Sequence, residues 1–181
     1  MKKIILLSGL LLSFCFSGFS QDIFEAARAN DTISLVKFIQ SGVKVDTTDG
    51  RGSTPLIIAV YNENEAAVKL LLQDGAFADA KDKAGNTAMM GACFKGYPNM
   101  VKLLYQHHAV VNTINLNGAT ALIFAATFGH LEIVNYLLEK GADPYIKDLR
   151  GKSGLDYAIN QENQAMIDLL KKAMDTDHHG A

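Results

Sequence analysis

Apolar positions recur along this chain at the three- and four-residue steps of an α-helix. Leu56, Ala59 and Val60 share one side of a short predicted helix, and Val68 and Leu71 share one side of the next. Residues at these spacings lie on one face of a helix, so each segment has an apolar face to bury. The pattern predicts pairs of short helices joined by tight turns, in which neither helix hides its apolar face alone.

The same arrangement repeats along the chain with a fixed period. Thr54, Thr87 and Thr120 are each 33 residues apart, and Ser153 follows after one more period. Four further columns keep this spacing: Gly52, Gly85, Gly118 and Gly151; Ala59, Ala92, Ala125 and Ala158; Leu71, Leu104, Leu137 and Leu170; and Asp49, Asp82, Asn115 and Asp148. The glycine permits a hairpin tip, and the Thr or Ser two residues later can cap the following helix. Stacked copies of such a unit bury one continuous core, which favours a solenoid.

Two stretches carry a resemblance to a known family. They are DGRGSTPLIIAV at 49–60 and NGATALIFAATFGHLEIVNYLLEKGADP at 117–144, and they resemble the ankyrin repeat pattern of a D-x-x-G-x hairpin tip, T-P-L-H-x-A-A-x-x-G-H and V-x-x-L-L-L ending in G-A-D. The resemblance implies an all-α ankyrin solenoid of about five helix–turn–helix units of 33 residues, with β-hairpin-like connecting loops. The implied domain covers residues 21–174, followed by a flexible tail at 175–181, and its units are 22–48, 49–81, 82–114, 115–147 and 148–174.

The sequence departs from the family pattern at two places. The histidine that ties neighbouring hairpins together in the family is replaced by apolar residues in three units, Ile57, Met90 and Ile123. We therefore expect apolar packing in place of that hydrogen-bond network. The glycine that turns between the helices is replaced by Glu63 and Glu162. We expect neighbouring asparagines (Asn62, Asn64 and Asn163) to take up the unusual dihedral, since Asn tolerates it well.

The first residues have the pattern of an export signal. Two lysines follow the initiator Met, an apolar block runs over 4–16, and Gly18 and Ser20 are the small residues of a cleavage site. This pattern predicts a signal peptide over residues 1–20 and a periplasmic or secreted protein. The alternative is an uncleaved anchor, although the apolar stretch is shorter than the roughly 20 residues that span a bilayer. No stable membrane insertion is expected after cleavage.

Composition and charge narrow the function further. The chain has 181 residues, 49% of them hydrophobic, and a net charge of −2 without any basic run, which argues against a nucleic-acid partner. Residues 1–20 hold two of the 17 basic and none of the 19 acidic residues, so without them the net charge is −4. Their removal also leaves Cys93 as the single cysteine, which cannot form an internal disulfide and stands in an apolar helix column. We expect it to be buried.

The candidate catalytic and metal-binding motifs are weak. The Gly151–Lys152–Ser153 triplet resembles the end of a phosphate-binding loop, but Ile146 stands where that motif needs glycine. His107 and His108 are adjacent and diverge on a helix, whereas a zinc site needs three or four converging ligands. Cys93 would need a nearby histidine to act as a nucleophile. We therefore predict no enzymatic activity, no catalytic residue, no metal site and no cofactor.

The resemblance also implies where a partner binds. In ankyrin repeats, the hairpin tips and the surfaces of the first helices line a concave groove. Aromatic residues fall at groove positions of three consecutive units, where packing does not require them. The residues carried over to this groove are Arg28, Arg51, Tyr61, Asn62, Lys83, Phe94, Lys95, Leu116, Thr127, Phe128, Leu149 and Arg150. Their mixture of cations and apolar groups predicts a protein partner that is acidic around an apolar patch.

The sequence therefore predicts a non-catalytic protein–protein interaction module of the exported compartment, expected to be a monomer. Its role would be that of an inhibitor, an immunity protein or an assembly helper. Two alternatives stay open. One is a metal or redox accessory protein that uses His107, His108 and Cys93. The other is a structural spacer without a specific partner.

Overall fold

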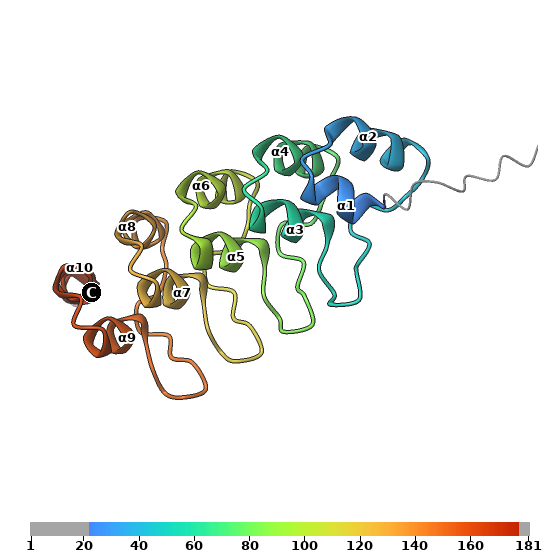
Figure 1. Ribbon diagram of the computed structural model, residues 1–181. Helices are drawn as coiled ribbons and strands as arrows, with labels where there is room; N and C mark the ends of the chain where they lie inside the picture. Colours follow the sequence, from blue (N-terminus) through green and yellow to red (C-terminus); the bar gives the residue numbers. More distant parts are fainter. Residues whose placement is uncertain (1–21, 178–181) are drawn as a thin grey trace, which may run out of the picture.

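The computed structural model describes residues 22–177 and forms a solenoid of two helix rows (Figure 1). The inner row consists of α1 (Ile23–Arg28), α3 (Pro55–Tyr61), α5 (Ala88–Lys95), α7 (Ala121–Thr127) and α9 (Gly154–Asn160). The outer row consists of α2 (Thr32–Gln40), α4 (Glu65–Gln73), α6 (Pro98–Gln106), α8 (Leu131–Glu139) and α10 (Gln164–Asp177). The predicted signal peptide and the last four residues of the predicted tail lie outside the described residues.

Hydroxyl caps set the start of each inner helix from α3 onward. The side chains of Thr54, Thr87 and Thr120 accept hydrogen bonds from the backbone N–H three residues later, at 3.3, 3.4 and 3.2 Å. Ser153 accepts from Asp156 N–H at 3.3 Å, and the Asp156 carboxylate in turn accepts from Ser153 N–H at 2.8 Å. The column of hydroxyl residues therefore caps helices as the sequence predicts.

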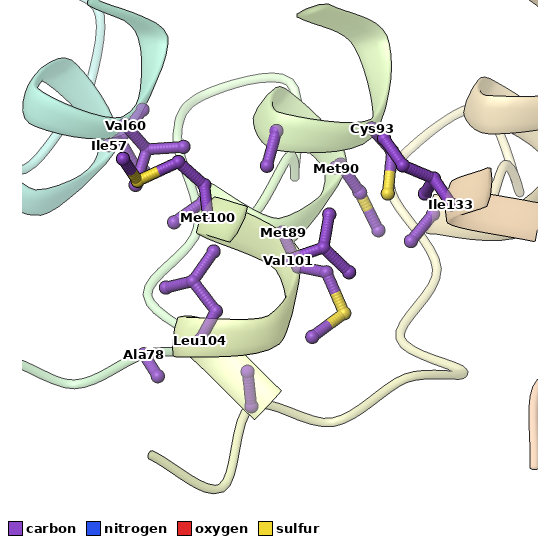
Figure 2. Close-up of a cluster of buried hydrophobic side chains, with 14 of the residues drawn as sticks. Ile57, Val60, Ala78, Met89, Met90, Cys93, Met100, Val101, Leu104 and Ile133 are labelled. Carbon is purple, nitrogen blue, oxygen red and sulfur yellow. The ribbon is translucent and has the colours of Figure 1, made fainter. Parts of the chain in front are cut away.

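The core lies between the repeats. Side chains from three consecutive repeats, such as Val60, Met100 and Ile133, belong to one buried cluster (Figure 2). The columns of alanine in the inner helices and of leucine in the outer helices are fully buried in every unit from the second to the fifth. Small alanines let neighbouring inner helices approach closely, while the leucines fill the space between the rows. Each repeat thus buries its apolar face against its neighbours.

Four hairpin-shaped turns connect the repeats and project from the inner row (Figure 1). In the first, Asp49 N–H donates to Ser53 C=O at 3.0 Å, and the Asp49 carboxylate accepts from the N–H groups of Arg51 and Ser53. Gly52 has a φ of 80°, and a Cβ there would lie 2.8 Å from the backbone nitrogen of Lys83. These turns form no strand within residues 22–177.

Backbone hydrogen bonds link each hairpin to the next. Lys83 N–H donates to Arg51 C=O at 3.0 Å, Leu116 N–H to Ala84 C=O at 3.0 Å and Leu149 N–H to Asn117 C=O at 2.9 Å. The three apolar residues that replace the family histidine are buried, as expected. The expectation that they replace a hydrogen-bond network is wrong in part, because the hairpins remain tied through their own backbone.

The turns within the repeats differ from the sequence expectation. Glu63 and Glu162 themselves adopt positive φ values of 57° and 56°. Asn62 and Asn64 have φ values of −100° and −85°, so the asparagines do not take up the unusual dihedral. Asn64 instead extends its side-chain amide to the carbonyl oxygens at the end of α1, both at 2.8 Å. The glutamates therefore adopt the energetically unfavourable positive φ that these turns require.

The last helix is longer than the other outer helices. Residues 175–177 belong to α10, although the sequence places them in a flexible tail. Met174 stands where Gly141 ends the preceding unit, so no glycine interrupts the helix. Tyr145 also donates its hydroxyl hydrogen to Met174 C=O at 2.8 Å. The helix thus continues three residues past the boundary that the sequence places at residue 174.

Candidate partner-binding groove

The inner helices and the hairpins place the predicted partner-binding residues along one side of the solenoid. All of them are exposed except Thr127, which is half-buried. Leu116 and Leu149 at the hairpin tips are 70% and 79% exposed. Equivalent positions of neighbouring units therefore present accessible side chains along the groove.

Three aromatic rings form a continuous stripe across the second, third and fourth repeats. The ring centroids of Tyr61 and Phe94 lie 6.1 Å apart in a stacked arrangement, and those of Phe94 and Phe128 lie 4.6 Å apart at 74°. Tyr61, Phe94 and Phe128 nevertheless remain 41%, 38% and 47% exposed. We call these three residues the aromatic stripe. Its rings contact one another and still present a large apolar area to a partner.

A recess of about 290 Å³ lies at the N-terminal end of the stripe. Arg28, Arg51, Tyr61 and Asp82 are among the residues that line it. Burial, and to a smaller degree the negative charge of Asp82, raises the pKa of the Tyr61 hydroxyl above its ordinary value. We call this space the first recess. Two arginines and an aromatic residue thus line the same recess.

A second recess of about 320 Å³ lies between α7 and α9 at the other end of the stripe. Phe124, Phe128, Leu149 and Tyr157 contribute to its lining, together with Asp148. Burial opposes ionisation of Asp148, but hydrogen bonds from the Tyr157 hydroxyl and from two backbone N–H groups outweigh it and hold its pKa below the ordinary value. The same hydrogen bond raises the pKa of Tyr157. We call this space the second recess.

The cations of the groove differ in how far they are neutralised. Arg28 forms an ion pair with Glu25, and Lys83 donates to the carbonyl oxygen of Gly50 at 2.8 Å. Lys95 lies over the ring of Tyr97, 5.8 Å from its centroid. The Arg51 side chain is 81% exposed, and its nearest carboxylate oxygen lies 3.8 Å away. Arg51 is therefore more available to a partner than Arg28, Lys83 or Lys95.

Sequence reasoning missed three residues that shape the groove. Phe124 contacts Phe94 edge-on at 6.5 Å, and Tyr157 closes the second recess. Gly91 stands at the same repeat position as these two and lies under the Tyr61 ring. For Phe124 and Tyr157 the signal was available in the column of Ile58, Gly91, Phe124 and Tyr157, which varies strongly while the next column is alanine in every one of these units.

The residues considered for a metal, redox or phosphate site are either buried or take part in helix caps and turns. Cys93 is fully buried, and burial raises the pKa of its thiol well above the ordinary value. His107 caps the end of α6, and His108 has a φ of 65° in the following turn. Within residues 22–177, no three His, Cys, Asp or Glu side chains are grouped as metal ligands. Ser153 of the phosphate-loop-like triplet caps α9, as the hairpin alignment implies.

Comparisons with known proteins agree with this architecture. A family model described as ankyrin repeats in three copies matches residues 23–115, and one described as ankyrin repeats in many copies matches residues 106–158. A search of curated proteins finds no match. Across the described part of the chain, every helix is too short or too polar to cross a bilayer. The chain belongs to the ankyrin repeat family, whose repeats generally mediate protein–protein interaction without catalysis.

Proposed function

We propose that this protein is an exported, non-catalytic module that holds a protein partner in its groove, as an inhibitor, an immunity protein or an assembly helper. The observation that supports this most is the aromatic stripe, which keeps about two-fifths of each ring exposed across three repeats. Interface hot spots are rich in aromatic residues and arginine, and contiguous apolar surface on a monomer marks a contact site. The stripe and its flanking arginines have this composition.

Export is proposed from the pattern of residues 1–20. A positive start, an apolar block and the small residues before Gln21 together match the requirements of a signal peptide. The test is to isolate the native protein from the exported fraction and determine its N-terminus. We expect Gln21 as the first residue, and a retained residue 1 would contradict the proposal.

The groove is tested by affinity capture from the exported fraction of the native cell. The bait is residues 21–181, run beside a variant with Tyr61→Ala, Phe94→Ala and Phe128→Ala. A matched control replaces three apolar residues that are more exposed than the stripe and lie on the outer row or in the loops after it: Ile33→Ala, Phe77→Ala and Val110→Ala. Circular dichroism and urea unfolding verify that both variants fold.

We expect a protein that is retained by the parent and by the control variant but lost from the stripe variant. Loss from the control variant alone would move the interface to the outer row. Equal retention by all three baits would contradict the groove assignment. Retention of nothing by the parent would favour a spacer without a specific partner.

A further inference from the structure

We propose that the groove takes an extended segment of the partner that carries a carboxylate at one end and a bulky apolar side chain at the other. The carboxylate, from Asp or Glu, binds Arg28 and Arg51 in the first recess. The apolar side chain enters the second recess between Phe128 and Leu149. This inference rests on the proposed function, because it names the chemistry of the partner of the same groove.

The first recess offers hydrogen-bond donors that the protein does not use. Within residues 22–177 the Arg51 guanidinium donates no hydrogen bond, and its one ion-pair contact, to Asp49 at 3.8 Å, is longer than a hydrogen bond. A guanidinium has five N–H donors in a planar fork that matches a carboxylate. Arg28 contributes a second guanidinium that pairs only with an exposed glutamate.

The carboxylate that lines the first recess is already engaged by its own hairpin. One oxygen of Asp82 accepts from the N–H groups of Ala84 and Asn86 at 2.8 Å, and the other accepts from the Asn86 side chain at 3.2 Å. Asp82 therefore stabilises the turn, while the exposed Arg51 keeps its donors unused. What the recess leaves free for a ligand is donor capacity, which an acidic side chain satisfies.

The second recess is complementary to an apolar group. Its carboxylate, Asp148, accepts from the Tyr157 hydroxyl at 2.5 Å and from the N–H groups of Arg150 and Lys152 at 2.9 and 3.0 Å. The exposed side chains of Phe128 and Leu149 remain around this satisfied polar floor. Arg150 also lines the recess, and its charge already acts on Asp148, where it helps to lower the pKa of that carboxyl. Burying such apolar surface contributes about 25 cal/mol per Å². An apolar side chain is therefore the occupant that gains most there.

The distance between the recesses sets the length of the segment. The first recess lies between the first two repeats and the second between the last two, so three repeat steps separate them. Packed helices lie about 8–10 Å apart, which gives a separation of about 24–30 Å. An extended chain rises about 3.3 Å per residue and covers this in about eight residues. Each recess holds a side chain rather than a helix, whose diameter is about 10–12 Å.

The test is selection of peptides from a random display library, with members of about 16 residues so that an eight-residue segment fits in several registers. The mature chain, residues 21–181, is the target. Counter-selection uses the variant with alanine at all three stripe positions. We expect the enriched peptides to share an Asp or Glu about eight residues from a Leu, Ile, Met or Phe.

Variants of the mature chain then test each end separately. Arg28→Gln with Arg51→Gln should weaken binding of an enriched peptide about tenfold or more, since charge-assisted hydrogen bonds are stronger than neutral ones. Arg51→Glu should shift the selection from acidic to basic peptides. Leu149→Ser should weaken the same peptides without changing the preference for acid. Lys37→Gln, on the outer helix α2, is the matched control for loss of a cation.

The outcomes separate this inference from the proposed function. Two results would overturn the inference and leave the groove function intact. One is enrichment of groove-dependent peptides that lack the acidic residue. The other is a set of peptides that bind the Arg28→Gln, Arg51→Gln variant as tightly as the parent. Peptides that bind the stripe variant as tightly as the parent would overturn both. Failure to enrich any peptide would overturn the proposal that the partner binds through a linear segment. Capture of a folded partner would still support the groove as the binding site.

Discussion

The ring of Tyr61 in α3 lies directly against the backbone of Gly91 in α5, one repeat further along. A Cβ built on Gly91 would lie 2.8 Å from Cε2 of that ring, closer than real side chains allow. Gly91 is in the middle of a helix, where glycine costs about 1 kcal/mol relative to alanine. The absence of a side chain at Gly91 therefore leaves the space in which the Tyr61 ring packs.

This relationship predicts a strong coupling between the two positions. In a Tyr61→Ala background, Gly91→Ala should stabilise the protein by about 1 kcal/mol, the gain in helix propensity. With Tyr61 present the gain should disappear, because the added methyl group displaces the Tyr61 ring. Urea unfolding of the parent, both single variants and the double variant measures the coupling energy. Changes that add to within about 0.5 kcal/mol would show that the contact is energetically irrelevant.

The repeat period accounts for most of what could be predicted. The spacing of Thr54 and its equivalents predicts the capped inner helices, because this contact recurs in each unit from the second to the fifth. The column that contains Cys93 predicts its burial, because Val60 and Ala126 at the same position are buried too, whereas Ile159 in the last unit is exposed. The aromatic stripe was accessible for a related reason, because Tyr61 and Phe94 occupy equivalent groove positions and Phe128 lies one position further along its unit. The contact between Gly91 and Tyr61 could not be predicted, because it depends on a ring that crosses from one repeat to the next.

One error arises from a local backbone preference that a tertiary contact overrides. Asn64 has the intrinsic preference for an unusual dihedral, but its side chain is needed at the end of α1, and Glu63 takes the positive φ instead. The Asn64 contact joins two repeats, so the preferences of the residues within one turn do not predict it. At the C-terminus, α10 extends through Asp177, three residues past the boundary that the sequence places at residue 174.

Replacing the strained glutamate should stabilise the protein. Glu63 holds a φ of 57°, where an L-residue costs about 1–2 kcal/mol, while glycine loses about 0.4–1 kcal/mol through its more flexible unfolded chain. Glu63→Gly should therefore raise the free energy of unfolding by about 0.5–1 kcal/mol in a urea titration. Lys171→Gly in the middle of α10 is the control and should lower it by about 1 kcal/mol. A loss of stability on Glu63→Gly would mean that the glutamate side chain has a structural role.

The buried caps predict a second stability series. Thr120 is 1% exposed, and its hydroxyl accepts from Ile123 N–H at 3.2 Å, so Thr120→Ala should cost about 1 kcal/mol by leaving this donor unpaired. Thr120→Ser keeps the hydroxyl and should recover most of the loss. Thermal and urea unfolding compare the three proteins. Equal stability of the serine and alanine variants would attribute the loss to the methyl group and contradict the capping role.

The thiol of Cys93 predicts a specific pH dependence of stability. Burial raises its pKa in the folded protein, whereas an unfolded thiol ionises near a pH of about 8.5. Below that pH both states keep the proton, and Cys93 adds no pH dependence. Above it only the unfolded chain releases the proton, so the thiol lowers stability by about 1.4 kcal/mol per pH unit. Cys93→Ala removes this contribution, so its free energy of unfolding should fall less steeply between pH 8 and 10.

Reactivity checks the same burial independently. A disulfide reagent should modify Cys93 only as fast as the folded protein opens, and immediately in denaturant, because the thiolate is the nucleophile and the folded site is closed to solvent. Rapid modification of the folded protein at neutral pH, together with equal pH slopes for the parent and Cys93→Ala, would contradict a buried, protonated thiol. That combination would instead favour a redox role for this cysteine.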